Sequence, residues 1–157
     1  MSLLPFFQWL AATRLSIAMS DSVWAFAIVE MVHLLGLALL GGAVLILNLR
    51  LLGLRLQRRP LHEVARELSP LFRTGLATML LSGVLLVCDG PLRYYGNTAF
   101  RLKMGLLAAA IAFSFTLHRR IVRSEASRIT GGARIAAVLS LTLWLSVGLA
   151  GRAIGFL

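Results

Sequence analysis

Two ionisable residues, Glu30 and His33, lie one helical turn apart within the run from Val23 to Leu47, which is otherwise almost wholly apolar. A charge at the centre of a bilayer costs about 2.5–3.5 kcal/mol on insertion scales, so such residues face the protein interior and mark candidate functional sites. An imidazole at this depth can ligate a metal ion. A carboxylate beside it can accept a hydrogen bond from the imidazole or pair with a cation.

A few basic residues lie at the outer ends of the apolar runs, above this histidine. At about 1.5 Å per residue, Glu30 lies roughly 10 Å and His33 roughly 15 Å below the outer end of the first span. Lys103 enters a later span just below the same surface, so we expect a buried ion pair between Glu30 and Lys103. Arg101 and Arg152 lie near the same outer level.

An excess of cations over a buried imidazole suggests an anionic ligand with a metal centre. Haem b fits, because imidazole ligates iron. The hypothesis assigns His33 as the metal ligand and Arg101, Lys103 and Arg152 as partners of the propionates. The alternative is that His33 is a hydrogen-bonded packing residue and no cofactor is bound. His118 is too far from His33 along the membrane normal to be the opposite axial ligand, and we expect a solvated or lipid-facing residue there.

The composition indicates a helical membrane protein. Of the 157 residues, 59% are hydrophobic and 14% are charged, whereas a soluble domain is nearer one half apolar and one quarter charged. Long apolar runs satisfy their own backbone only as helices or closed barrels, and these runs do not alternate as barrel strands do. The net charge of +10 does not indicate nucleic acid, because the basic residues cluster at the ends of apolar runs.

We therefore expect an all-α fold: an integral membrane four-helix bundle with an N-terminal interfacial amphipathic helix, forming a single transmembrane domain over residues 1–157. Ser20-Asp21-Ser22 should cap the first span, Pro70 should begin the second, and Leu61 to Leu68 should form only a short helical turn. The interfacial helix and the four spans are expected at about 3–19, 23–47, 70–87, 100–117 and 135–150.

Basic residues also predict the orientation, since loops rich in arginine stay in the cytoplasm. The side that holds the two inter-helix loops carries most of the 16 basic residues, and the other side carries Arg14, Arg93, Arg101, Lys103 and Arg152. The eleven on the loop side are Arg50, Arg55, Arg58, Arg59, Arg66, Arg73, Arg119, Arg120, Arg123, Arg128 and Arg134. Both termini are thus expected outside the cytoplasm.

Several strings resemble a bacterial family of four-helix membrane proteins that has no established activity. They are Glu30-Met31-Val32-His33-Leu34-Leu35-Gly36, Leu49-Arg50, Arg93-Tyr94-Tyr95-Gly96-Asn97, Phe100-Arg101-Leu102-Lys103-Met104 and Gly151-Arg152. More distantly, the pattern is similar to copper resistance protein D and to HemJ-type protoporphyrinogen oxidases. His33 and Lys103 match a first-helix histidine and a lysine that opens a later helix in those proteins. The resemblance implies haem b at that histidine; Glu30 is not part of the HemJ pattern.

Three functions remain open. The leading hypothesis is a haem b-binding protein of the bacterial inner membrane, with both termini in the periplasm, that transfers electrons or oxidises a small hydrophobic substrate near the outer leaflet. The second is a transporter of copper or another ion, with Glu30, His33 and Cys88 along the path. The third is an accessory subunit of a larger membrane complex. The partners expected are the lipid bilayer, a second copy of the chain or such a complex, and no nucleic acid.

Overall fold

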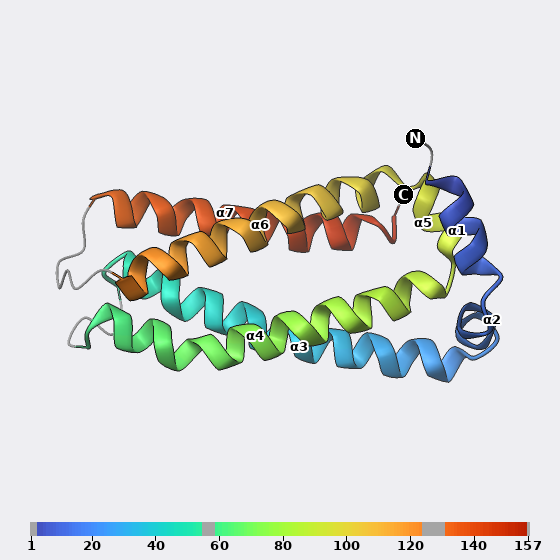
Figure 1. Ribbon diagram of the computed structural model, residues 1–157, viewed down its shortest axis with the longest axis horizontal. Coiled ribbons are helices and arrows are strands. Elements are labelled where there is room, and N and C mark those ends of the chain that lie inside the picture. Colours follow the sequence, from blue (N-terminus) through green and yellow to red (C-terminus); the bar gives the residue numbers. More distant parts are fainter. Residues whose placement is uncertain (1–2, 55–58, 124–130, 157) are drawn as a thin grey trace.

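Four long apolar helices form the body of the protein, as a computed structural model shows for residues 3–54, 59–123 and 131–156 (Figure 1). The long helices are α3 (Val23–Leu51), α4 (Leu61–Cys88), α6 (Thr98–Arg123) and α7 (Gly131–Ala153). Three short helices, α1 (Leu4–Ala11), α2 (Arg14–Ser20) and α5 (Pro91–Gly96), lie together at one end, which we call the cap end. The other end, where α3 ends and α4 begins, is called the far end. The predicted all-α four-helix bundle is confirmed.

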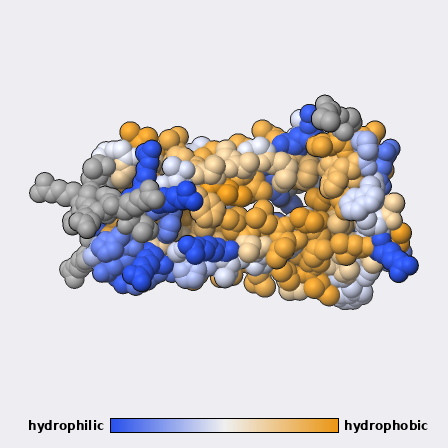
Figure 2. All heavy atoms as spheres, in the orientation of Figure 1, coloured by the Kyte–Doolittle hydropathy of each residue, from blue (hydrophilic) through white to orange (hydrophobic). Residues whose placement is uncertain are grey.

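Each long helix is long and apolar enough to cross a membrane. Figure 2 shows that hydrophobic residues cover most of the visible face between the two ends, and that hydrophilic residues gather towards the ends. Many large apolar side chains are exposed, including Leu34, Leu81 and Leu149. A surface of this kind requires an apolar medium such as the lipid bilayer, so the protein is a multi-pass membrane protein.

The bundle consists of two helix pairs. The most extensive contacts run between α3 and α4 and between α6 and α7. At the far end all four helices meet around a core of Leu51, Ala65, Ile121 and Ala137. Closer to the middle, Leu40 and Val44 of α3 pack with Leu76 of α4. The far half of the bundle is therefore the part in which the two pairs are held together.

The tight packing of α3 on α4 depends on glycine at their crossing. A Cβ atom added at Gly75 would lie 2.6 Å from the backbone nitrogen of Leu40 and 3.0 Å from the carbonyl oxygen of Gly36. Real Cβ contacts are not this short, so only glycine permits the two backbones to approach so closely. This crossing fixes the register of α4 along α3, and the register decides which polar residues meet.

The second span differs from its prediction. We expected it to begin at Pro70, but α4 begins at Leu61 and passes through Pro70 without ending. A proline inside a helix removes one backbone hydrogen bond, which costs about 3 kcal/mol. Val64 and Ala65 are buried ahead of Pro70, and Ala65 belongs to the far-end core, so burial of this first section offsets that cost.

The N-terminal segment also differs, because one helix was expected at 3–19 and two short helices are present. The break falls at Thr13, whose side chain accepts a hydrogen bond from the Ser16 backbone N–H at 3.2 Å and thereby caps α2. The predicted cap of the first span is confirmed, since the Ser22 side chain accepts from the Ala25 N–H at 3.2 Å. The Ser16 hydroxyl donates to the Cys88 carbonyl at 2.6 Å and ties α2 to the end of α4.

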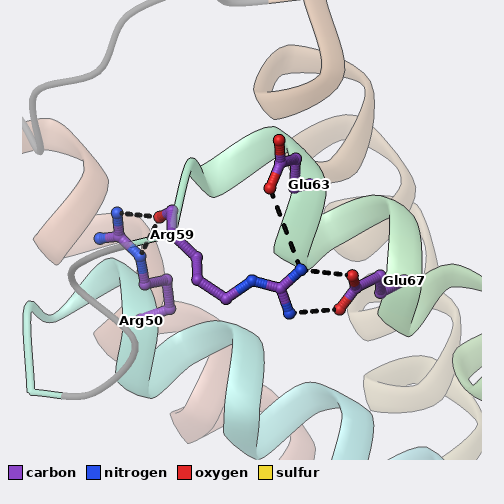
Figure 3. A network of polar contacts seen from close by, with 4 residues as sticks. All are labelled: Arg50, Arg59, Glu63 and Glu67. Carbon is purple, nitrogen blue, oxygen red and sulfur yellow. Dashed lines mark hydrogen bonds and ion pairs between the residues drawn. The ribbon is translucent and has the colours of Figure 1, made fainter.

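A polar network orders the far end (Figure 3). Arg50, at the end of α3, donates hydrogen bonds to the Arg59 carbonyl oxygen from Nε at 3.2 Å and from Nη2 at 2.8 Å. The Arg59 guanidinium in turn forms a two-point contact with the Glu67 carboxylate and lies 3.9 Å from Glu63. Hydrogen bonding to Glu67 raises the pKa of Arg59 above its usual value. Both carboxylates of this part of α4 are thus engaged by Arg59.

Candidate functional site

The His33 imidazole is held by a serine from the neighbouring helix. His33 Nδ1 lies 2.8 Å from the hydroxyl oxygen of Ser82 on α4. That hydroxyl donates its single proton to the Thr78 carbonyl one turn earlier in the same helix. We assign the Ser82 proton to this carbonyl; in that arrangement the Ser82 oxygen accepts from His33, and Nδ1 carries the proton.

This assignment has a chemical consequence for the other ring nitrogen. In a neutral imidazole with the proton on Nδ1, Nε2 has a free lone pair, and this is the form that ligates metals. Histidine ligands commonly donate their second ring N–H to a fixed acceptor, which orients the ring and selects the tautomer. The pair formed by His33 and Ser82 meets that requirement, and Ser82 itself is buried, with 3% of its surface exposed.

The ring lies against a small residue of α4. A Cβ atom added at Gly83 would be 3.4 Å from His33 Cε1, which is ordinary contact distance. The imidazole therefore packs on the α4 backbone without an intervening side chain. Together, Ser82 and Gly83 make α4 a support on one side of the ring, and His33 remains half-buried.

The two helix pairs separate towards the cap end, beside this histidine. At the far end the α3 face that carries Asn48 reaches α7, where the Asn48 amide donates to the Ser140 hydroxyl at 3.1 Å. By helical spacing, Leu37 and Gly41 lie on the same face, yet both are exposed. A Cβ atom added at Gly41 would have no neighbour within 4 Å. Figure 2 shows a narrow opening between the pairs in this half.

Lys103 lies on α6, in the helix pair that faces α3 and α4, near the cap end. Its Nζ lies 3.3 Å from the position of a Cβ atom added at Gly151, so the side chain runs between α6 and α7 where glycine leaves room. Lys103 is half-buried. Of the four residues assigned to haem from the sequence, the structure thus brings His33 and Lys103 into the same half of the bundle.

Arg101 and Arg152, unlike Lys103, are exposed on the outside of the bundle. Arg101 is exposed and, two residues before Lys103, points about 200° away from it around α6. Arg152 is also exposed, and its guanidinium lies 5.2 Å from the centre of the Phe156 ring. Both remain at the cap end, and within the part of the chain that the structure describes neither forms a hydrogen bond with Lys103 or His33.

The ion pair predicted between Glu30 and Lys103 does not form. Glu30 is exposed, and among the ion pairs of residues 3–54, 59–123 and 131–156 none includes it. The reason lies in the packing of α3, whose buried side is set by Gly36, Leu40 and Val44 against α4. Glu30 lies to one side of that contact, on the face that the separating α6–α7 pair leaves uncovered.

Reasoning from sequence missed two features. Ser82 was not identified, although a serine four residues after Thr78 in an apolar run was a usable signal. His118 was expected to be solvated or lipid-facing, but it is half-buried and lines a pocket with Arg73 at the far end. His62 is exposed and Cys88 is buried at the end of α4.

The donor set limits the kind of metal that can bind. Among the described residues, no three His, Cys, Asp or Glu side chains come together. A bare ion needs several protein ligands, whereas a macrocycle brings most of its own donors and requires one or two from the protein. A single oriented histidine beside an opening is compatible with the second kind of ligand.

Fold and site together define a multi-pass helical membrane protein with one oriented intramembrane histidine. The chain belongs to the DUF6644 family, a family of unknown function, whose sequence profile matches residues 6–157. No curated protein and no solved structure matches the chain.

Proposed function

We propose that this protein binds haem b through His33 and acts in electron transfer or as an oxidoreductase near the cap-end surface of the membrane. The observation that carries the proposal is the 2.8 Å contact between His33 Nδ1 and the Ser82 hydroxyl; with the proton assigned to Nδ1, Nε2 would be free to ligate iron. A bound haem would supply one-electron chemistry at its iron. The chain's own residues would hold it, orient it and limit the access of water.

Three residues have roles in this proposal. His33 is the iron ligand, and Ser82 positions its ring. Lys103, on the facing helix pair, is the cation best placed to neutralise a propionate, because it is half-buried beside Gly151. Arg101 and Arg152 are exposed at the same end and would add to the positive potential there without enclosing the ligand.

The proposal includes an orientation in the membrane. In the sequence, eleven of the 16 basic residues belong to the two inter-helix loops and their flanks, so the far end would face the cytoplasm. The cap end, with both termini and the His33 site, would face the periplasm of a bacterial inner membrane.

Copper handling is the less favoured alternative, because a path for a bare ion needs several ligands in reach of one another. His33 and Cys88 are not part of such a group among the described residues. The other alternative, an accessory subunit without a cofactor, is less favoured because it gives no role to a half-buried histidine whose Nε2 is free.

The proposal is tested by haem titration of the detergent-purified protein, followed by absorbance. Wild type should develop a Soret band that saturates at one haem per chain. His33→Ala should abolish the band, and the matched variant His118→Ala should retain it, since both changes remove one half-buried imidazole. Circular dichroism must show that both variants remain helical. A band that survives in His33→Ala, or that is lost only in His118→Ala, contradicts the assignment.

A further inference from the structure

A second site lies in the far half of the bundle, between α4 and α6. A pocket of about 40 Å³ is lined by Val44 and Leu47 of α3 and by Phe72 and Phe115, whose rings pack edge to face with centroids 5.9 Å apart. A wider pocket of about 590 Å³ adjoins it on the outside and shares Ser69, Arg73 and His118 with it. The inner part is narrow and apolar, which suits the end of a hydrocarbon chain better than a ring system.

The mouth of this cleft is basic. Arg66 and Arg73 of α4 line the wider pocket together with His118 of α6. Neither arginine has an ion pair among the described residues. The nearest acids along α4, Glu63 and Glu67, are engaged by Arg59 (Figure 3). Two guanidinium groups therefore face the cleft with no carboxylate to compensate them in the described part.

The depth of these residues matches a lipid head group. Helix α4 has 28 residues and is roughly 42 Å long, against about 30 Å for the hydrocarbon core. With Cys88 at the cap-end boundary, about eight residues project beyond the far-end boundary, and Arg66 lies near that boundary. Arg73 is then within the first two turns inside the hydrocarbon core, where arginine extends its head group towards the interface.

We propose that this cleft binds an anionic phospholipid of the far-end leaflet. Its phosphate would contact Arg66, Arg73 and His118, and one acyl chain would enter alongside the paired rings of Phe72 and Phe115, towards Val44 and Leu47. Basic pockets between transmembrane helices are established sites for anionic head groups in general. The inference does not depend on the proposal for His33, because it concerns other residues in the opposite half of the bundle.

The test uses full-length protein, delipidated in detergent, with the midpoint of thermal unfolding as the readout. Dioleoyl-phosphatidylglycerol should raise the midpoint. Dioleoyl-phosphatidylcholine, with identical chains and no net charge, should not, and inorganic phosphate, which lacks the chains, should not either. Equal stabilisation by the two lipids, or by phosphate alone, overturns the proposal.

Variants locate the site. Each arginine near a lipid surface is worth a factor of about five in affinity, so Arg66→Gln with Arg73→Gln should weaken phosphatidylglycerol binding about 30-fold. The control, Arg119→Gln with Arg120→Gln, removes the same charge from the same end outside the cleft and should change affinity less than about twofold. Similar losses in both double variants would indicate adsorption to a charged surface and overturn the site.

Two further variants keep the test decisive. Arg73→Gln alone, with an expected loss of about fivefold, replaces the double variant if that one does not fold. Ser69→Leu narrows the cleft and leaves every charge in place, so it should weaken binding of phosphatidylglycerol while retaining the wild-type helical content. Undiminished binding in both Arg73→Gln and Ser69→Leu would refute the site.

Discussion

Removal of the Ser82 hydroxyl is the perturbation that bears most closely on the positioning of His33. In Ser82→Ala, the Nδ1–H loses its acceptor, because the 2.8 Å contact to Ser82 is the hydrogen bond of this ring that the structure shows. The proton is then no longer confined to Nδ1, and the ring is free to turn. Partners of this kind are worth about 10- to 100-fold in metal affinity.

We therefore expect the haem dissociation constant of Ser82→Ala to rise by about 10- to 100-fold, which corresponds to about 1.4–2.7 kcal/mol. The free energy of unfolding should fall by about 1 kcal/mol for the lost hydrogen bond. The assay is a haem titration followed at the Soret band, with unfolding measured separately without haem.

Ser140→Ala is a matched control. Ser140 is 4% exposed against 3% for Ser82, and its hydroxyl also accepts a side-chain N–H, from Asn48 at 3.1 Å. It lies at the far end of the α3–α7 contact, so its loss should lower stability by a similar amount and leave haem affinity unchanged. An unchanged haem affinity in Ser82→Ala, or an equal loss in Ser140→Ala, would refute the reasoning about the tautomer.

Further predictions concern packing, charge and orientation. Gly75→Ala should lower the thermal midpoint strongly, since its Cβ would meet the Leu40 backbone nitrogen at 2.6 Å. The control Gly105→Ala, whose Cβ would have no atom within 4 Å, should raise the free energy of unfolding by about 0.5–1 kcal/mol, and equal effects of the two variants would refute the close crossing. Glu30→Gln should change the free energy of unfolding by less than about 0.5 kcal/mol, because Glu30 is exposed and forms no ion pair in the described chain. A large loss of stability in this variant would contradict the structure and support an ion pair between Glu30 and Lys103. Reporter fusions after Arg59 and Arg123 should report the cytoplasm, and a fusion after Leu157 the periplasm; a cytoplasmic C-terminus would contradict the orientation.

The number and class of the helices could be predicted from the sequence because apolar runs of sufficient length have few alternatives in a membrane. Their ends were harder to place. Pro70 is a valid signal for a helix start, but it was overridden by burial of Val64 and Ala65 against other helices. Local preference is a weak guide wherever packing between distant segments decides the outcome.

The candidate site, too, could be predicted from the sequence only in part. His33 could be found because an ionisable residue inside an apolar run is rare. Ser82 could not be paired with it, since the two are 49 residues apart and their meeting depends on the register set at Gly75. The pairing of Glu30 failed for a related reason: helical periodicity identifies a face, but not whether a neighbouring helix covers that face along its whole length.

The most direct test of the central claim is the absorption spectrum of wild-type protein purified in detergent from haem-supplied cells, recorded before and after reduction with dithionite. We expect a Soret band that shifts on reduction, and a pyridine haemochrome of the b type at about one haem per chain. A colourless preparation of folded protein that also fails to take up added haem would contradict it.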